Sequence, residues 1–160
     1  MKIDVVIGNP PYQVSDEGLN KDSATPIYHH FIDRFKDLKP NYISMIIPSK
    51  WMKGGKGLNQ FRKRMIDDTR ISHLVDFQDS IEIFPSVGIS GGVCYFLWES
   101  NYNGKVDYTY HALNGEVDKS TRYLNNTVTD NIIRDSRQLS IIEKAAIDEE
   151  VFFDSIVKDE

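Results

Sequence analysis

The chain has 160 residues, of which 40% are hydrophobic and 27% are charged, as expected for one globular domain with an apolar core. Its net charge of −5 argues against a broad nucleic-acid-binding face, and its single cysteine excludes an internal disulfide framework. No run approaches the roughly 18 apolar residues of a membrane span. The N-terminus does not resemble a signal peptide, so we expect a cytoplasmic protein without a membrane partner.

The first part of the chain alternates strand and helix patterns. Residues 3–7 (IDVVI) are typical of a strand buried on both faces, and the polar residues 13–23 predict a loop. Apolar residues recur at helical spacing from 27 to 38. Residues 42–47 (YISMII) predict a second buried strand, and the apolar stripe of 58–66 predicts a second helix.

The second part of the chain begins with strand patterns and becomes more polar. Residues 71–77 and 93–98 predict two further strands, and the alternation of 105–111 indicates an edge strand. Residues 112–130 lack a clear pattern, whereas 132–147 predict a helix. Strands that alternate with helices indicate an α/β domain with a mostly parallel sheet.

Residues 9–12 (NPPY) lie directly beyond the first predicted strand, where ligands bind in open α/β sheets. A simple tight turn is the alternative interpretation. The prolines fix the backbone and remove N–H donors, which holds Asn9 extended and leaves carbonyls as acceptors. The Asn9 amide oxygen and the Pro10 carbonyl can then accept both hydrogen bonds of one planar amino group, while Tyr12 offers an aromatic face. This combination suits methyl transfer to an exocyclic amine.

The segment IDVVIGNPPY resembles the catalytic strand and loop of S-adenosylmethionine-dependent N6-adenine DNA methyltransferases. It is most similar to the γ-type enzymes of type II and type IIG restriction–modification systems. The resemblance extends through YISMIIPSKWM and ISHLVDF to GISGGVCYFLWE, and it covers roughly residues 2 to 99. It implies the second half of a Rossmann-like methyltransferase sheet, with an antiparallel strand near its end.

The resemblance assigns site residues by position. It implies that Asn9 and Pro10 accept hydrogen bonds from the adenine amino group, within a catalytic loop that also contains Pro11 and Tyr12. Tyr12 would stack on the flipped base, and Phe84 matches the family's second aromatic contact to that base. A base must leave the duplex for this chemistry, and stacking offsets part of the unstacking cost of a few kcal/mol.

The resemblance also predicts what this chain lacks. Such enzymes bind S-adenosylmethionine through a Gly-rich loop after an earlier strand, whereas the glycines at 54–57 and 88–92 follow other strands and are interpreted as turns. We expect residues 1–111 to be the catalytic half of a methyltransferase domain. Residues 112–160 would be a polar extension with a helix toward a missing target-recognition region. The expected partners are the rest of the methyltransferase domain and double-stranded DNA.

A cationic stretch lies in the middle of the chain. Residues 46–66 contain six Lys or Arg residues and no acidic residue. Lys50, Lys53 and Lys56 are the predicted DNA contacts, and the alternative is a solvated helix face.

Other chemically active side chains are given structural roles. No histidine or cysteine has a partner at ligand spacing, so no metal site is predicted. Trp51 and Trp98 are predicted to be packing residues, and Cys94 a buried, unreactive thiol. Asp76 and Asp79 are interpreted as solvated loop carboxylates.

The sequence thus predicts a fragment of a DNA adenine N6-methyltransferase from a restriction–modification enzyme, inactive as an isolated chain. One alternative keeps the chemistry and changes the acceptor to a protein glutamine or an RNA guanine. The other alternative is a non-catalytic piece that binds DNA or a partner subunit.

Overall fold

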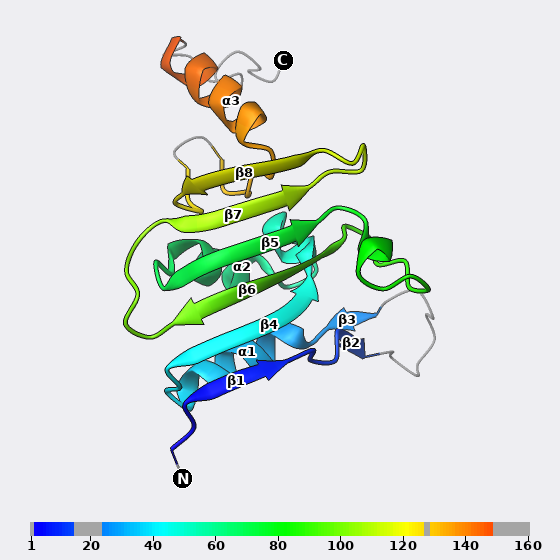
Figure 1. The fold of residues 1–160 in the computed structure, drawn as a ribbon, viewed down its shortest axis with the longest axis vertical. Coiled ribbons are helices and arrows are strands. Elements are labelled where there is room, and N and C mark those ends of the chain that lie inside the picture. Colours follow the sequence, from blue (N-terminus) through cyan, green and yellow to red (C-terminus); the bar gives the residue numbers. More distant parts are fainter. Residues whose placement is uncertain (1, 15–23, 127–128, 149–160) are drawn as a thin grey trace, which may run out of the picture.

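Six strands form one mixed sheet in the computed structural model, which describes residues 2–14, 24–126 and 129–148 (Figure 1). The spatial order is β1-β4-β6-β5-β7-β8. The β1–β4 and β5–β7 pairs are parallel, while β6 is antiparallel to both β4 and β5, and β8 to β7. The strands are β1 (Val5–Gly8), β4 (Tyr42–Pro48), β5 (Ile71–Phe77), β6 (Val93–Glu99), β7 (Val106–His111) and β8 (Val117–Arg122).

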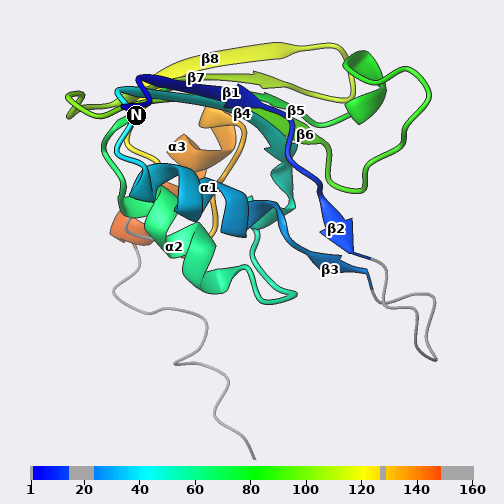
Figure 2. The ribbon, with the colours of Figure 1, turned by 90° about the horizontal axis from the view of Figure 1, so that it is seen from below.

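Three α-helices lie on the same side of this sheet, as Figure 2 shows. They are α1 (Tyr28–Asp37), α2 (Asn59–Asp67) and α3 (Ser136–Asp148). Two short 3₁₀ turns follow β4 and β5, namely η1 (Ser49–Met52) and η2 (Ser80–Glu82). A separate antiparallel pair joins β2 (Gln13–Val14) to β3 (Thr25–Pro26).

The hydrophobic core lies between the sheet and these helices. In β4, Ile43, Met45 and Ile47 are at most 2% exposed, whereas the side chains between them are half-buried on the opposite face. From the helices, Ile32 of α1 and Phe61 of α2 are at most 1% exposed and complete the core. Side chains in a strand alternate between faces, so one face of the sheet is packed and the other is left open.

The prediction that the first strand is buried on both faces is wrong. Val5 is 50% exposed and Ile7 is 77% exposed, on the open face of the sheet. Within the described residues, β1 pairs only with β4, so its other edge has no strand beside it. The continuous apolar pattern of this strand indicates a neighbour that the described residues do not provide.

Most of the other predicted strands and helices are confirmed, and one assignment is wrong. The strands at 42–47, 71–77 and 93–98 and the helices around 27–38 and 58–66 are confirmed. The strand at 106–111 is not an edge strand, because β8 pairs along its outer side. Residues 112–130, which lack a clear sequence pattern, thus contain β8, and the helix predicted at 132–147 is confirmed by α3. The functional division at residue 111 stays a prediction.

The residues 13–23 predicted to form a loop are only partly described. Gln13 and Val14 form β2, and residues 15–23 lie outside the described residues. No helix in the described part of the chain is long and apolar enough to cross a membrane.

Candidate functional site

The NPPY loop follows β1 without a gap, at the carboxyl end of the parallel β1–β4 pair. Pro10 is buried and Tyr12 is half-buried, whereas Asn9 and Pro11 are exposed. The Tyr12 carbonyl accepts a hydrogen bond from the Ile27 N–H at 3.1 Å, which ties the loop to the start of α1. The loop therefore lies where ligands bind in open α/β sheets, and its exposed amide is accessible to a substrate.

A cavity of about 390 Å³ opens beside this loop. Its volume falls within the usual range for small-molecule sites. Segments from five parts of the chain meet there, namely the end of the NPPY loop, the β3–α1 junction, the end of β4 with the start of η1, the residue before α2, and the loop between β5 and β6. Its lining residues are Tyr12, Gln13, Pro26, Tyr28, Pro48, Lys50, Leu58, Val87, Gly88, Ile89 and Ser90.

Two tyrosine side chains give this cavity unsatisfied polar groups. The hydroxyls of Tyr12 and Tyr28 are buried and make no hydrogen bond of normal geometry with the described residues, although Tyr12 lies near the Asn9 side chain. Burial, aided by the Cys94 thiol, raises the pKa of Tyr12 to about 12, while Asn9 opposes this shift. Burial likewise raises the pKa of Tyr28 above its usual value of 10. Both phenols are therefore protonated at neutral pH, and Tyr28 lies near the Trp51 backbone as Tyr12 lies near Asn9.

The loop between β5 and β6 forms one wall of the cavity, and Ser80 holds it in shape. The Ser80 hydroxyl donates to the Val87 carbonyl at 2.8 Å and accepts from the Ile89 N–H at 2.7 Å. Because Ser80 is only 1% exposed, these hydrogen bonds join the two sides of the loop in a dry environment. Sequence patterns gave no sign of this role.

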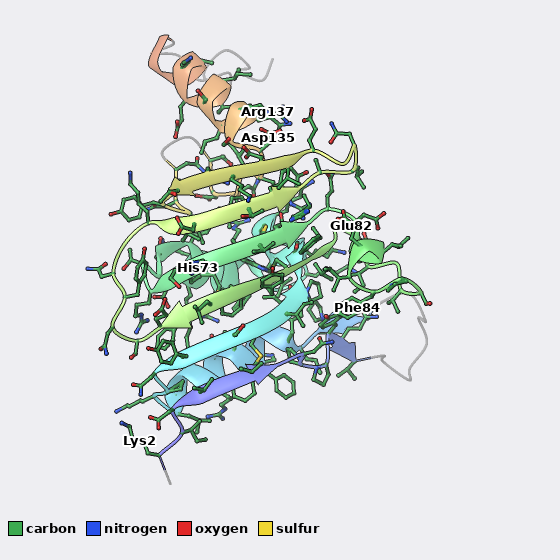
Figure 3. The ribbon with its side chains drawn as sticks, viewed as in Figure 1. Lys2, His73, Glu82, Phe84, Asp135 and Arg137 are labelled. Carbon is green, nitrogen blue, oxygen red and sulfur yellow. The ribbon has the colours of Figure 1, made fainter. Side chains whose placement is uncertain are left out.

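Phe84, the predicted second stacking residue, lies on the same loop but does not line the 390 Å³ cavity. It lies at the end of the sheet where β2 and β3 are found, away from Asp135 and Arg137 beyond β8 (Figure 3). The structure thus brings the loop of Phe84 to the cavity, and the contact of its ring with a base stays a prediction.

A buried ionic network that the sequence did not reveal lies next to the end of β4. Asp76 is fully buried, so its interpretation as a solvated carboxylate is wrong. It accepts hydrogen bonds from the Ser49 hydroxyl at 2.6 Å, from the Tyr108 hydroxyl at 2.9 Å, and from two nitrogens of the Arg134 guanidinium. Burial alone would lower the pKa of Arg134, but Asp76 raises it overall. The network fixes Ser49 directly after the cavity residue Pro48.

Asp79 has a different environment. It is half-buried, and its carboxylate accepts a hydrogen bond from the Ile81 N–H at 3.0 Å, at the start of η2. Its role is therefore local, in shaping the beginning of the β5–β6 loop.

The three predicted DNA-contacting lysines follow β4 closely and are all exposed. Lys50 lines the 390 Å³ cavity, and Lys53 and Lys56 follow on the connection to α2. Among the described residues these three form no ion pair, whereas Lys36, Lys63 and Arg64 on the two helices do. Their positive charge is free to act on a ligand.

The packing predictions are confirmed. Trp51 and Cys94 are fully buried, and the Trp51 indole N–H points to the Cys94 sulfur at 3.5 Å. Burial raises the pKa of Cys94 to about 12, so the thiol stays protonated. Trp98 is 3% exposed and donates to Asp68 at 2.9 Å.

A larger cavity of about 540 Å³ lies between α2 and residues 125–126 and 129–130. It is lined mainly by amide and charged side chains of the surface and contains no residue of the NPPY loop. We assign the functional site to the smaller cavity because aromatic walls, buried hydroxyls and the rigid loop meet there.

The glycine-containing loops at 54–57 and 88–92, interpreted from the sequence as turns, follow η1 and η2. Gly54, Gly55 and Gly57 all have positive φ, as turns require. The part of the enzyme that holds the methyl donor stays a prediction.

Comparison with known proteins gives three findings. The family model of the Eco57I restriction-modification methylase matches residues 1–84. A protein of Mycoplasma pneumoniae described as an uncharacterized adenine-specific methylase is 38% identical over 137 residues, which are 82% of this chain and 32% of that protein. A chain from a solved type I restriction–modification system superposes with a TM-score of 0.51 at 16% identity, over 97% of this chain and 33% of that one.

These findings differ in what they establish. The similarity to the solved chain concerns the fold and agrees with the mixed Rossmann-like sheet. The chain spans about a third of the length of the curated relative that it matches. The family model matches more than half of the chain and includes the NPPY loop. The chain belongs to the Eco57I restriction-modification methylase family.

Proposed function

We propose that this chain is the catalytic part of a DNA adenine N6-methyltransferase of a restriction–modification enzyme. The main support is the position of the Asn9–Tyr12 loop at the carboxyl end of β1, beside an aromatic cavity with two unsatisfied phenols. Family membership and the adenine-specific methylase description of the relative support the same reaction.

In the proposed mechanism, a flipped adenine presents its exocyclic amino group to the NPPY loop. The Asn9 amide oxygen and the Pro10 carbonyl accept its two N–H bonds, which concentrates electron density on the nitrogen. The nitrogen would gain positive charge as it takes the methyl group from the donor's sulfonium, whose carbon–sulfur bond breaks to release a thioether. Both acceptors stabilise that charge more than the neutral amine, until the nitrogen loses a proton to solvent. Tyr12, and Phe84 from the opposite loop, stack on the base and offset the cost of unstacking.

The methyl donor of this reaction is S-adenosylmethionine, which we assign to the rest of the enzyme. The outer edge of β1 is the proposed junction, because its backbone has no strand beside it and Ile7 is 77% exposed. A target-recognition domain is a second proposed partner, and a type IIG architecture fits the resemblance of the NPPY segment.

The decisive test is Asn9→Ala in the complete enzyme that contains this chain. Loss of one preorganised acceptor should lower the methylation rate by about two to three orders of magnitude or more. Affinity for DNA should stay nearly unchanged, because Asn9 is an exposed side chain of one short loop. The matched control is Asn101→Ala, an exposed asparagine beyond the end of β6, which should retain full activity. Undiminished turnover of the Asn9 variant would disprove the catalytic assignment.

The acceptor is tested by labelling. With tritiated S-adenosylmethionine, we expect label in duplex DNA, because Lys50 lines the cavity and Lys50, Lys53 and Lys56 form no ion pair with the described residues. Label confined to protein glutamine or to RNA would move the same chemistry to another substrate.

A non-catalytic binding piece is the second candidate. The observation that favours it is the lack of a cofactor site among the described residues. If the complete enzyme methylates DNA and Asn9→Ala abolishes the reaction, this candidate is excluded.

A further inference from the structure

A second cavity, of about 190 Å³, adjoins the proposed base-binding cavity. Lys50 and Ser90 line both cavities, so a ligand in one lies next to a ligand in the other. Ser49, Lys53, Gly91 and Arg134 belong to the second cavity alone. None of the assignments made above gives this cavity a role.

The walls of this cavity are positively charged. Lys50, Lys53 and Arg134 line it, and no acidic residue does. Asp76 lies behind the wall, fully buried, and its charge is matched by the Arg134 guanidinium that it binds through two nitrogens. The charges of Lys50 and Lys53 therefore remain uncompensated by the described residues.

Hydrogen bonds hold two of the wall residues in a fixed position. The Asp76 network anchors Ser49 and Arg134, because both donate to the same buried carboxylate. The Ser49 N–H donates to the Gly92 carbonyl at 3.0 Å, which holds the end of the β5–β6 loop against η1. Gly91, with φ of +92°, lets the backbone itself line the cavity at this point.

We propose that the 190 Å³ cavity is a phosphate subsite, which binds a phosphate group of the nucleotide whose base occupies the 390 Å³ cavity. The subsite is smaller than a typical site for a drug-sized ligand, and its two lysines and the Ser90 hydroxyl match the groups that bind phosphate oxygens. The proposal rests on the proposed function. It adds that the enzyme holds the flipped nucleotide by its backbone as well as by its base.

The test is an NMR titration of the chain with four probes. These are 2′-deoxyadenosine, its 5′-monophosphate, its 3′-monophosphate and inorganic phosphate. We expect the nucleoside to shift the amides around Tyr12 and Gln13. Inorganic phosphate should shift those of Ser90 and Gly91, and at least one monophosphate should shift both groups.

The difference in affinity between the nucleoside and its monophosphates gives a quantitative test. The better monophosphate should bind roughly fivefold more tightly than the nucleoside, as expected for contact with partly solvated charges. Lys53→Gln should remove this difference and leave nucleoside affinity unchanged. The matched control is Lys119→Gln, on the exposed β8, which should behave as wild type.

The outcomes separate the two proposals. If the nucleoside binds but phosphate adds nothing and leaves Ser90 and Gly91 unshifted, the subsite is disproved and the proposed function stands. If Lys53→Gln weakens the binding of inorganic phosphate but neither the nucleoside nor its monophosphates bind, the phosphate subsite is supported. The proposed adenine-directed function is then contradicted. Equal weakening of phosphate binding by Lys53→Gln and Lys119→Gln would indicate unspecific charge attraction and would overturn the subsite.

Discussion

Asp76 fixes the position of Ser49 at the wall of the 190 Å³ cavity and forms a buried ion pair with Arg134. A buried ion pair that loses one charge leaves the other uncompensated. We therefore expect Asp76→Asn to lower the free energy of unfolding by about 3 to 5 kcal/mol, measured by urea denaturation. Asp37→Asn, at a carboxylate that is 69% exposed, should change it by less than about 1 kcal/mol. A similarly small effect at Asp76 would show that the network is not essential to the fold.

Asp68 provides a prediction for the pH dependence of stability. Its side chain is 6% exposed and accepts from Lys36 at 2.8 Å, from Arg70 at 2.7 Å and from Trp98 at 2.9 Å. Burial alone would raise the pKa of Asp68, but these three donors hold it well below its usual 3.8. The stabilisation is thus fully present above the unfolded-state pKa and is lost as the pH falls through the lower folded-state pKa.

Unfolding free energies of wild type and Asp68→Asn, followed by circular dichroism, measure this effect. The advantage of wild type should be constant near neutral pH and should shrink from about pH 5 downward. For Asp37→Asn we expect no comparable slope. If the wild-type and Asp68→Asn curves run parallel from neutral pH into acid, the inferred depression of the Asp68 pKa is wrong.

The residue scale also shows the limit of sequence-based prediction. Asn9 and Tyr12 were identifiable because their motif is contiguous, and its chemistry follows from adjacent residue types. Asp76 and Arg134 are 58 positions apart, and nothing in the local pattern of either indicates the other. Such a pair depends on the fold, which brings the end of β5 next to the segment before α3.

At the scale of elements, the β5–β6 loop is the part of the site most open to testing. Ser80→Ala removes the acceptor of the Ile89 N–H and the donor to the Val87 carbonyl. Hydrogen exchange at the Ile89 amide should accelerate about tenfold or more, while the amides of β6 keep their protection. Ser86→Ala is the control, because this exposed serine lies on the same loop. Unchanged exchange at Ile89 would show that other contacts hold the loop.

Strands and helices were predictable where one of their faces packs into the core. The stripe of α2 and the apolar run of β4 gave clear periodic signals, and both elements formed as expected. β8 (VDKSTR) was missed because its alternating exposure leaves few apolar residues to mark a period. β1 was recognised as a strand, but its burial was overestimated because the pattern does not say which element covers it.

At the scale of the whole molecule, the sheet has two different edges. β8 is short of apolar residues, as solvent-facing edges usually are, whereas β1 exposes Val5 and Ile7 beside the NPPY loop. The proposed active site therefore lies at the edge that is least suited to face water.

This arrangement predicts the behaviour of the chain toward S-adenosylmethionine. Titration calorimetry should detect no micromolar binding by the chain alone, because the proposed function assigns the methyl donor to another part of the enzyme. The complete enzyme is the positive control. Micromolar binding by the isolated chain would mean that the cofactor site has been assigned to the wrong part of the enzyme.

The continuity of β1 with the NPPY loop has a consequence for how the enzyme assembles. Under the proposed arrangement, the partner that pairs along β1 also holds the methyl donor. A register error of one residue would then displace the donor by about 3.3 Å along the strand. Reacting atoms must lie within about 3 to 3.5 Å of each other. Such a misassembled enzyme would therefore bind DNA without methylating it. A methylation assay would thus report whether the two parts of the sheet have joined in the correct register.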